Sequence, residues 1–215
     1  MSKVRSARKR QRQIVRRPTK MVPASTAGPK SRGALLREAP AWPLHECLLS
    51  RDWQKSGAIT QALVARRSPD GPIAAALFLI DLGCLGIKNG FTRLCSSEEY
   101  HQLRQEVQAR QEMGRVELNL VAKVIQEASD YAERLGFAPH PDARRGMTLL
   151  AGADPAACDT PIPLGDGQGK PLFIAGPYDN VQAIMAKLER AVGRDGFAGL
   201  VPLSGDEELF VDEEE

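Results

Sequence analysis

No stretch of this sequence approaches the ~20 consecutive apolar residues that a membrane-spanning helix needs. The longest apolar run, over residues 73–80, is far shorter, and no apolar segment follows the basic start as it would in a secretion signal. Cysteines are few, form no Cys-x-x-Cys pair and lack the dense spacing of a disulfide-stapled secreted domain. They are Cys47, Cys84, Cys95 and Cys158. These absences predict a cytoplasmic protein with reduced thiols and no membrane partner.

Acidic residues are absent from the first 32 residues, which contain eleven Lys and Arg. That leaves eighteen of the 29 basic residues in the rest of the chain, against all 27 acidic ones. Because so charged a segment with so few apolar side chains cannot bury enough surface to offset its chain entropy, we expect it to be disordered. A separation of charge on this scale is typical of an interaction tail.

The remainder has the composition of a folded domain, since hydrophobic residues make up 42% of the chain. We expect a disordered basic arm over residues 1–32, a single α+β domain over residues 33–203 and an acidic C-terminal tail over residues 204–215.

The clearest strand signal is a β-hairpin. Two apolar runs, residues 58–66 and 73–81, flank the segment Ser68-Pro69-Asp70-Gly71, whose Pro, Asp and Gly favour a tight turn. The second run ends at Asp81 and is followed by a glycine-punctuated loop over residues 82–91. We also predict a short helix or irregular segment over residues 42–53, a short strand over residues 147–151 and a hairpin across residues 165–169.

Helices are indicated in several segments, the shortest over residues 34–38, before Pro40 and Pro43. Ser96 and Glu99 form the pattern of a capping box at a helix start, and apolar residues at helical spacing predict a long helix that ends at Gly136. Asp179 or Asn180 is expected to cap a last helix over residues 181–192. The predicted fold is a two-layer α+β sandwich with helices on one face of a largely antiparallel sheet: a long central helix and a C-terminal helix.

Three segments carry a resemblance to known sequences: FLIDLGCLGIK at residues 78–88, ASDYAERLGFAPHPD at residues 128–142 and GKPLFIAGPYD at residues 169–179. In these segments the chain resembles a family of uncharacterised bacterial proteins. The resemblance extends over about residues 42–200 and excludes both tails. It implies a shared domain and no particular activity.

The basic arm is the strongest functional signal. Each Lys or Arg that neutralises a phosphate releases condensed counterions, so about eleven cations suffice for salt-sensitive nucleic-acid binding. We therefore predict association with nucleic acid, with RNA or the ribosome favoured over DNA. The same composition also fits an organelle transit peptide or an inert solvated tail. The residues expected to contact phosphate are Arg5, Arg8, Lys9, Arg10, Arg12, Arg16, Arg17 and Lys20.

The alternative is a metal-dependent hydrolase or nuclease. Asp81 ends an apolar strand before a glycine loop, where enzymes often place a metal ligand or a general base, although Asp is also an ordinary turn residue there. His140 and Asp142 follow the long helix and could complete a site for Mg²⁺ or Mn²⁺. A divalent metal is expected only under this hypothesis, and the sequence leaves open whether the protein is an enzyme.

Overall fold

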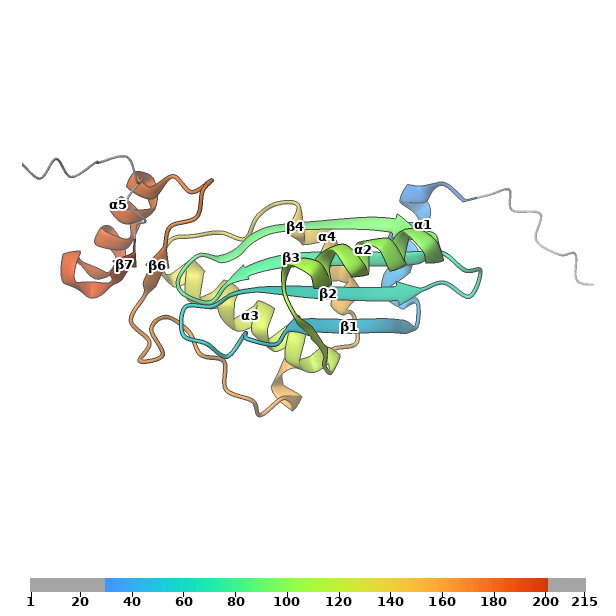
Figure 1. Ribbon diagram of the computed structural model, residues 1–215, viewed down its shortest axis with the longest axis horizontal. Coiled ribbons are helices and arrows are strands. Elements are labelled where there is room, and N and C mark those ends of the chain that lie inside the picture. Colours follow the sequence, from blue (N-terminus) through green and yellow to red (C-terminus); the bar gives the residue numbers. More distant parts are fainter. Residues whose placement is uncertain (1–29, 201–215) are drawn as a thin grey trace, which may run out of the picture. The chain divides into compact units, whose positions relative to one another are not determined.

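A five-stranded antiparallel sheet is the largest element of residues 30–200, the part of the chain that the computed structural model describes (Figure 1). Its strands are β1 (Leu44–Ser50), β2 (Ile59–Arg67), β3 (Ile73–Asp81), β4 (Gly86–Cys95) and β5 (Met113–Arg115). The first four are antiparallel neighbours in chain order, and β5 pairs with the remaining edge of β1. The predicted α+β class with a largely antiparallel sheet is confirmed. The predictions for residues 1–29 and for the acidic tail lie outside the described residues.

The predicted hairpin is present as β2 and β3. Its turn is closed by two backbone hydrogen bonds, from Ser68 N–H to Pro72 O at 2.8 Å and from Gly71 N–H to Ser68 O at 3.0 Å. Gly71 has φ of +107°, a conformation that glycine adopts without steric cost. The sequence pattern therefore located both strands and the residues that reverse the chain.

Two other strands were not expected. Residues 42–53 were predicted as a short helix or irregular segment, yet they contain β1, in which every residue from Glu46 to Ser50 is buried. Residues 82–91 were predicted as a loop, yet β4 begins at Gly86. Both predictions were wrong because β1 is buried on both faces and β4 is interrupted by glycines and an irregular register, so neither alternates cleanly.

Each face of the sheet has its own apolar core. Helices α3 (Leu118–Arg134) and α4 (Ala143–Met147) pack against one face, where Phe78, Ile80 and Val124 are buried. Helix α2 (Ser97–Arg110) packs against the other face through Tyr100 and Leu103. In Figure 1, α2 and α3 accordingly lie on opposite sides of the sheet. The prediction placed helices on one face only, and α2 adds a layer on the second.

The helix ends follow the predicted chemistry. Glu99 N–H donates to Ser96 Oγ at 3.2 Å and Ser96 N–H donates to Glu99 Oε2 at 2.6 Å, so the capping box is formed. Gly136 has φ of +86° after α3, and Phe137 N–H donates to Ala132 O at 2.9 Å. The first described helix, α1 (Arg32–Glu38), is capped by the Ser31 side chain.

The C-terminal part of the described chain forms a βαβ unit. Strands β6 (Leu172–Ile174) and β7 (Ala198–Leu200) are parallel neighbours, joined by α5 (Val181–Val192). The side chain of Asn180 caps α5 by accepting from Ala183 N–H at 3.0 Å, as one of the two expected caps. The buried residues Phe173, Leu188 and Phe197 of this unit form one apolar cluster with residues of the β3–β4 loop and the end of α3: Cys84, Leu85, Tyr131 and Leu135.

Two further predictions in this region were wrong. Residues 147–151, predicted as a strand, instead form the end of α4 and a 3-10 turn over Thr148–Leu150. Residues 165–169 do not join a hairpin, because β6 pairs with β7, which is distant in sequence. The glycine-rich segment closes as a loop in which Asp166 N–H donates to Lys170 O at 2.9 Å. Among the helices of residues 30–200, none is long and apolar enough to cross a membrane.

Candidate functional site

Asp81 lies at the end of β3 with only 2% of its surface exposed. Its Oδ1 atom accepts hydrogen bonds from Cys84 N–H at 2.9 Å and from Leu85 N–H at 3.3 Å. Burial raises the pKa of Asp81, and the backbone N–H groups and the Lys88 charge act against that rise. The carboxylate therefore caps the short loop between β3 and β4, as a turn residue does.

His140 and Asp142 lie together just before α4. His140 N–H donates to Ile87 O at 2.9 Å, which fastens this segment to β4. The His140 Nδ1 atom accepts from Asp142 N–H at 3.3 Å and lies 3.8 Å from Asp142 Oδ2. Both side chains are substantially exposed, at 38% and 74%. The predicted residues thus form one facing pair, while Asp81 directs its hydrogen bonds into its own loop.

A metal site would need further ligands beside that pair. Within residues 30–200, no group of three or more His, Cys, Asp or Glu side chains is placed to hold a metal ion. The hydrolase hypothesis stays a prediction.

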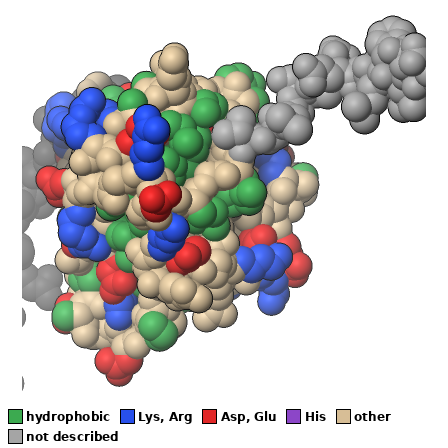
Figure 2. Space-filling view, turned by 90° about the vertical axis from the view of Figure 1, so that its left-hand side faces the viewer, with side chains coloured by type: hydrophobic (Ala, Val, Ile, Leu, Met, Phe, Trp, Pro, Cys, Tyr) green, Lys and Arg blue, Asp and Glu red, His purple; other side chains and the backbone are tan. Residues whose placement is uncertain are grey.

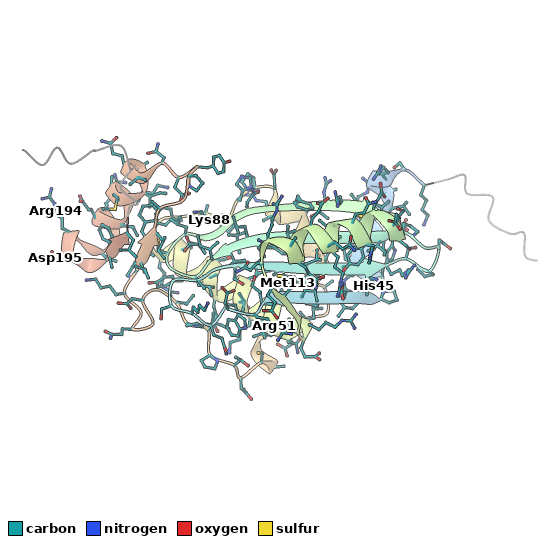
Figure 3. The ribbon with its side chains drawn as sticks, viewed as in Figure 1. His45, Arg51, Lys88, Met113, Arg194 and Asp195 are labelled. Atoms are coloured by element: carbon teal, nitrogen blue, oxygen red, sulfur yellow. The ribbon has the colours of Figure 1, made fainter. Side chains whose placement is uncertain are left out.

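A nearly buried ion pair connects the sheet to the βαβ unit. Lys88 Nζ on β4 lies 2.6 Å from Asp179 Oδ2, and the two side chains are 14% and 12% exposed. The same oxygen accepts from Gly176 N–H at 2.8 Å. Lys88 lies at the end of the sheet nearest α5 (Figure 3). Residues 176–179, which lead into α5, are therefore held in place by Lys88. The Gly176 N–H group already has an acceptor in Asp179.

A buried carboxylate organises the other end of the sheet, where His45 lies (Figure 3). Glu46 Oε2 accepts from Tyr100 O–H at 2.7 Å and from Arg104 Nε at 2.9 Å, and its Oε1 lies 3.0 Å from an Arg115 nitrogen. Burial alone would raise the pKa of Glu46, but these hydrogen bonds and charges outweigh it and the pKa is lowered. This cluster ties β1, α2 and β5 together.

An exposed aromatic ring and a guanidinium group lie together on the edge strand β4. The Phe91 side chain is exposed at 39%, and the Arg93 guanidinium carbon lies 5.7 Å from the centre of its ring. Beside them is a hollow of about 340 Å³, lined by Phe91, Thr92, Pro141, Asp142 and Arg145. We call the residues that line this hollow the β4–α4 surface. By the strand register, the Phe91 and Arg93 side chains belong to the face of β4 that α2 covers, and α4 packs on the opposite face.

Two structural features place these groups. Strand β4 is at the edge of the sheet, so its outer side is not covered by another strand of the described residues. Helix α4 approaches it closely because Gly90 has no side chain: a Cβ there would lie 3.0 Å from Ala143. Arg145 on α4 is thereby brought to the same hollow as Phe91.

The sequence interpretation missed this surface. It treated residues 82–91 as a loop, whereas Phe91 and Arg93 are alternate residues of a strand and share one face of the sheet. The alternation of Phe91, Arg93 and Cys95 was the available signal. The sequence carries no such signal for Arg145, because the position of that residue near β4 depends on how α4 packs.

The charges of the described domain are balanced. Nine of the 29 basic residues precede residue 30, so twenty lie in residues 30–200, and twenty of the 27 acidic residues lie there too. Figure 2 shows Lys and Arg side chains interspersed with Asp and Glu side chains on the side of the domain that carries α5. The acidic excess noted beyond the arm therefore belongs mainly to residues 201–215, which contain the other seven acids.

Comparison of the chain with protein-family models, with curated proteins and with solved structures finds no match.

Proposed function

We propose that the protein associates with nucleic acid, RNA or the ribosome, through its basic N-terminal arm. The observation that carries the proposal is the composition of residues 1–32, which hold eleven Lys and Arg and no acid. A polyanion bound there releases condensed counterions, and this entropy gain drives association that needs no preformed pocket. Aromatic side chains are absent from the arm, so its contacts are with phosphate.

The balanced charge of residues 30–200 supports the proposal. Beyond the arm, residues 33–200 hold eighteen basic and twenty acidic residues, so their net charge of −2 repels a polyanion held by the arm only weakly. The seven acids of residues 201–215 are the only net negative contribution beyond that domain. The arm is therefore expected to dominate the interaction at low salt.

The test is RNA binding by the full chain and by a variant in which Arg8, Lys9, Arg10, Arg12, Arg16 and Arg17 are changed to Gln. Fluorescence anisotropy with a labelled single-stranded RNA, at several salt concentrations, gives the slope of log K against log salt. Removing one cation that pairs with a phosphate lowers that slope by about 0.7 for a single strand. We expect a slope lower by up to about 4 and much weaker binding for the arm variant.

A control variant carries six Arg or Lys to Gln changes at exposed positions of the domain: Arg51, Lys55, Arg110, Lys170, Arg190 and Arg194. It has the same net charge as the arm variant, so a specific role of the arm predicts a much smaller effect. Equal binding by the wild type and the arm variant would contradict the proposal. The same measurement with DNA of matching sequence decides the preference for RNA.

A further inference from the structure

Two adjoining hollows lie along α3. The first, of about 370 Å³, has a mainly apolar lining that includes Ile125, Met147 and Leu150. The second, of about 620 Å³, is more polar and shares Gln126 and Pro155 with the first. Both volumes lie in the range of ligand sites, ~300–1,000 Å³. We call the residues that line the two hollows the α3 groove.

The α3 groove carries an excess of negative charge. Its only cation, Lys123, is already engaged: the Nζ atom donates to Cys158 O at 2.7 Å and lies 3.7 Å from Glu127 Oε1. Asp130 and Asp159 are exposed, and neither forms an ion pair with another residue between 30 and 200. Four carboxylates against one ammonium group leave the lining with a net charge of −3. The carboxylates are those of Glu127, Asp130, Asp154 and Asp159.

We propose that the α3 groove is a docking site for a basic, amphipathic segment of a partner protein. An aliphatic side chain of the partner fills the apolar hollow, and its Lys or Arg residues pair with Asp130 and Asp159. Peptide-binding grooves combine an apolar floor with charges that complement the bound segment. Met147 suits this role, because its flexible side chain adapts to the shape of a bound group. This docking is independent of the proposed contact between the arm and RNA.

The charge of the α3 groove argues against two other occupants. RNA carries a phosphate at each nucleotide, and the carboxylates of the groove repel it. A second copy that docked groove to groove would place Asp130 and Asp159 against the same residues of the first, because a two-fold interface joins identical patches. Like charges oppose that contact. A cation-rich segment meets neither obstacle, and its charges also guide its approach.

The α3 groove is long enough for a segment of chain. Its α3 residues extend from Ala122 to Asp130, which is about 12 Å along the helix axis at ~1.5 Å per residue. An extended peptide covers that length with about four residues, and a helix with about two turns. The partner can therefore place an apolar anchor in the first hollow and cations beside it.

The test uses the full chain and three fluorescein-labelled peptides of equal length. The first repeats Leu-Lys-Lys-Leu, the second has Ser in place of Leu, and the third has Glu in place of Lys. Fluorescence anisotropy at low salt should show binding of the first peptide and about tenfold weaker binding of the second, which lacks the apolar anchor. The third should not bind, because the groove repels it. Equal binding of the first two peptides would overturn the proposal.

A charge variant tests whether the first peptide lies in the groove. D130N/D159N removes two of the groove's carboxylates and should weaken binding about fivefold at low salt. The matched control is D70N/D195N, which changes two exposed aspartates that do not line the groove. If both double variants bind the peptide equally well, the peptide lies elsewhere and the proposal is overturned.

A steric variant tests the apolar hollow. Ser129→Phe adds a ring to the lining of this hollow and should weaken binding of the first peptide by about tenfold or more. Ala191→Phe, at an exposed position of α5, is the matched control. Thermal unfolding shows that both variants are folded. Equal binding by the two variants would overturn the proposal.

Other occupants give distinct results. If the arm variant binds the first peptide more tightly than the domain control variant of the same net charge, a basic segment of this chain already fills the groove, and the proposal is overturned. If sedimentation shows self-association that S129F abolishes, the occupant is a second copy and the proposal is again overturned. Peptide binding by a monomeric chain, weakened by D130N/D159N and S129F and equal in the arm and domain variants, supports a partner segment.

Discussion

Two buried carboxylates in this protein are shifted in opposite directions for reasons that their surroundings explain. Asp81 faces backbone amides in an enclosed loop, and burial raises its pKa. Glu46 faces a tyrosine hydroxyl and two guanidinium groups, and these lower its pKa despite burial. A raised pKa at Asp81 is therefore accounted for by its loop and is not by itself a sign of catalysis.

We expect Glu46→Gln to lower the free energy of unfolding by about 1–3 kcal/mol at neutral pH. The neutral amide removes the counter-charge of Arg104 and Arg115 and turns a donor toward one of them. The loss stays moderate because the Arg115 side chain is 78% exposed and is rehydrated by water. The matched control is Glu112→Gln, which breaks an exposed ion pair with Arg51 and should cost at most about 1 kcal/mol. Urea unfolding of the three proteins measures both values.

Wild type and E46Q should also differ in how their free energy of unfolding depends on pH. Because the folded-state pKa of Glu46 is lowered, the ionised group stabilises the wild type fully above the ordinary Glu range, about pH 4.3. As the pH falls through the folded-state pKa, protonation removes this contribution. The difference in unfolding free energy between wild type and E46Q should therefore narrow in acid. A constant difference down to pH 3 would show that the charge of Glu46 is not what stabilises the fold.

At the scale of elements, glycine residues decide where α4 lies, because they let the helix approach the sheet closely. A Cβ added at Gly146 would lie 2.8 Å from the Phe78 ring and 3.0 Å from Ala76 Cβ. Phe78 is fully buried, so it has no room to move away. The position of α4 on the sheet thus depends on Gly146.

Gly146→Ala should destabilise the protein by about 1–3 kcal/mol through overpacking, although alanine is the better helix former. Gly33→Ala is the matched control, because it also lies in a helix but would meet only Arg37, at 3.9 Å. It should be neutral or stabilising by up to about 1 kcal/mol. Thermal unfolding of both variants decides the matter, and equal melting temperatures would argue against the tight contact of α4 with β3.

The elements that could be predicted are those whose signals are local. The turn at Pro69-Asp70-Gly71, the Ser96 capping box and the Gly136 stop each depend on a few neighbouring residues, and each is present. Strand β1 and the pairing of β6 with β7 could not be predicted in the same way, because they depend on burial and on partners far along the chain. The β4–α4 surface was missed for the same reason.

At the scale of the whole molecule, the hairpin and the amphipathic helices predicted the α+β class. They did not predict how many helical layers cover the sheet. The second face of the sheet is covered by α2, whose apolar residues Tyr100, Leu103 and Val107 form a narrow stripe among charged neighbours. The candidate site, too, was predictable only in part. His140 and Asp142 were expected together and lie together, whereas the contacts of Asp81 within its own loop depend on the fold.

The βαβ unit is joined to the sheet partly by the ion pair of Lys88 and Asp179. Removing this pair should therefore destabilise the βαβ unit more than the rest of the domain. Lys88→Met leaves a nearly buried carboxylate without its counter-charge and should cost about 2–4 kcal/mol locally. Hydrogen exchange should then accelerate in α5 far more than in α3. Lys55→Met, which removes an exposed pair with Asp52, is the control and should change neither helix. Equal acceleration in α3 would show that the ion pair stabilises the whole domain.

The parallel pairing of β6 and β7 has a consequence for biosynthesis. Strand β6 is made before α5, but its partner is Ala198–Leu200, at the very end of the described chain. The sheet of residues 44–115 can therefore assemble early in translation, whereas the cluster around Phe173 is completed only after residues 197–200 have emerged from the ribosome. During that interval Phe173, Leu188 and their neighbours are exposed to chaperones and proteases, and a premature stop before Ala198 would leave them so permanently.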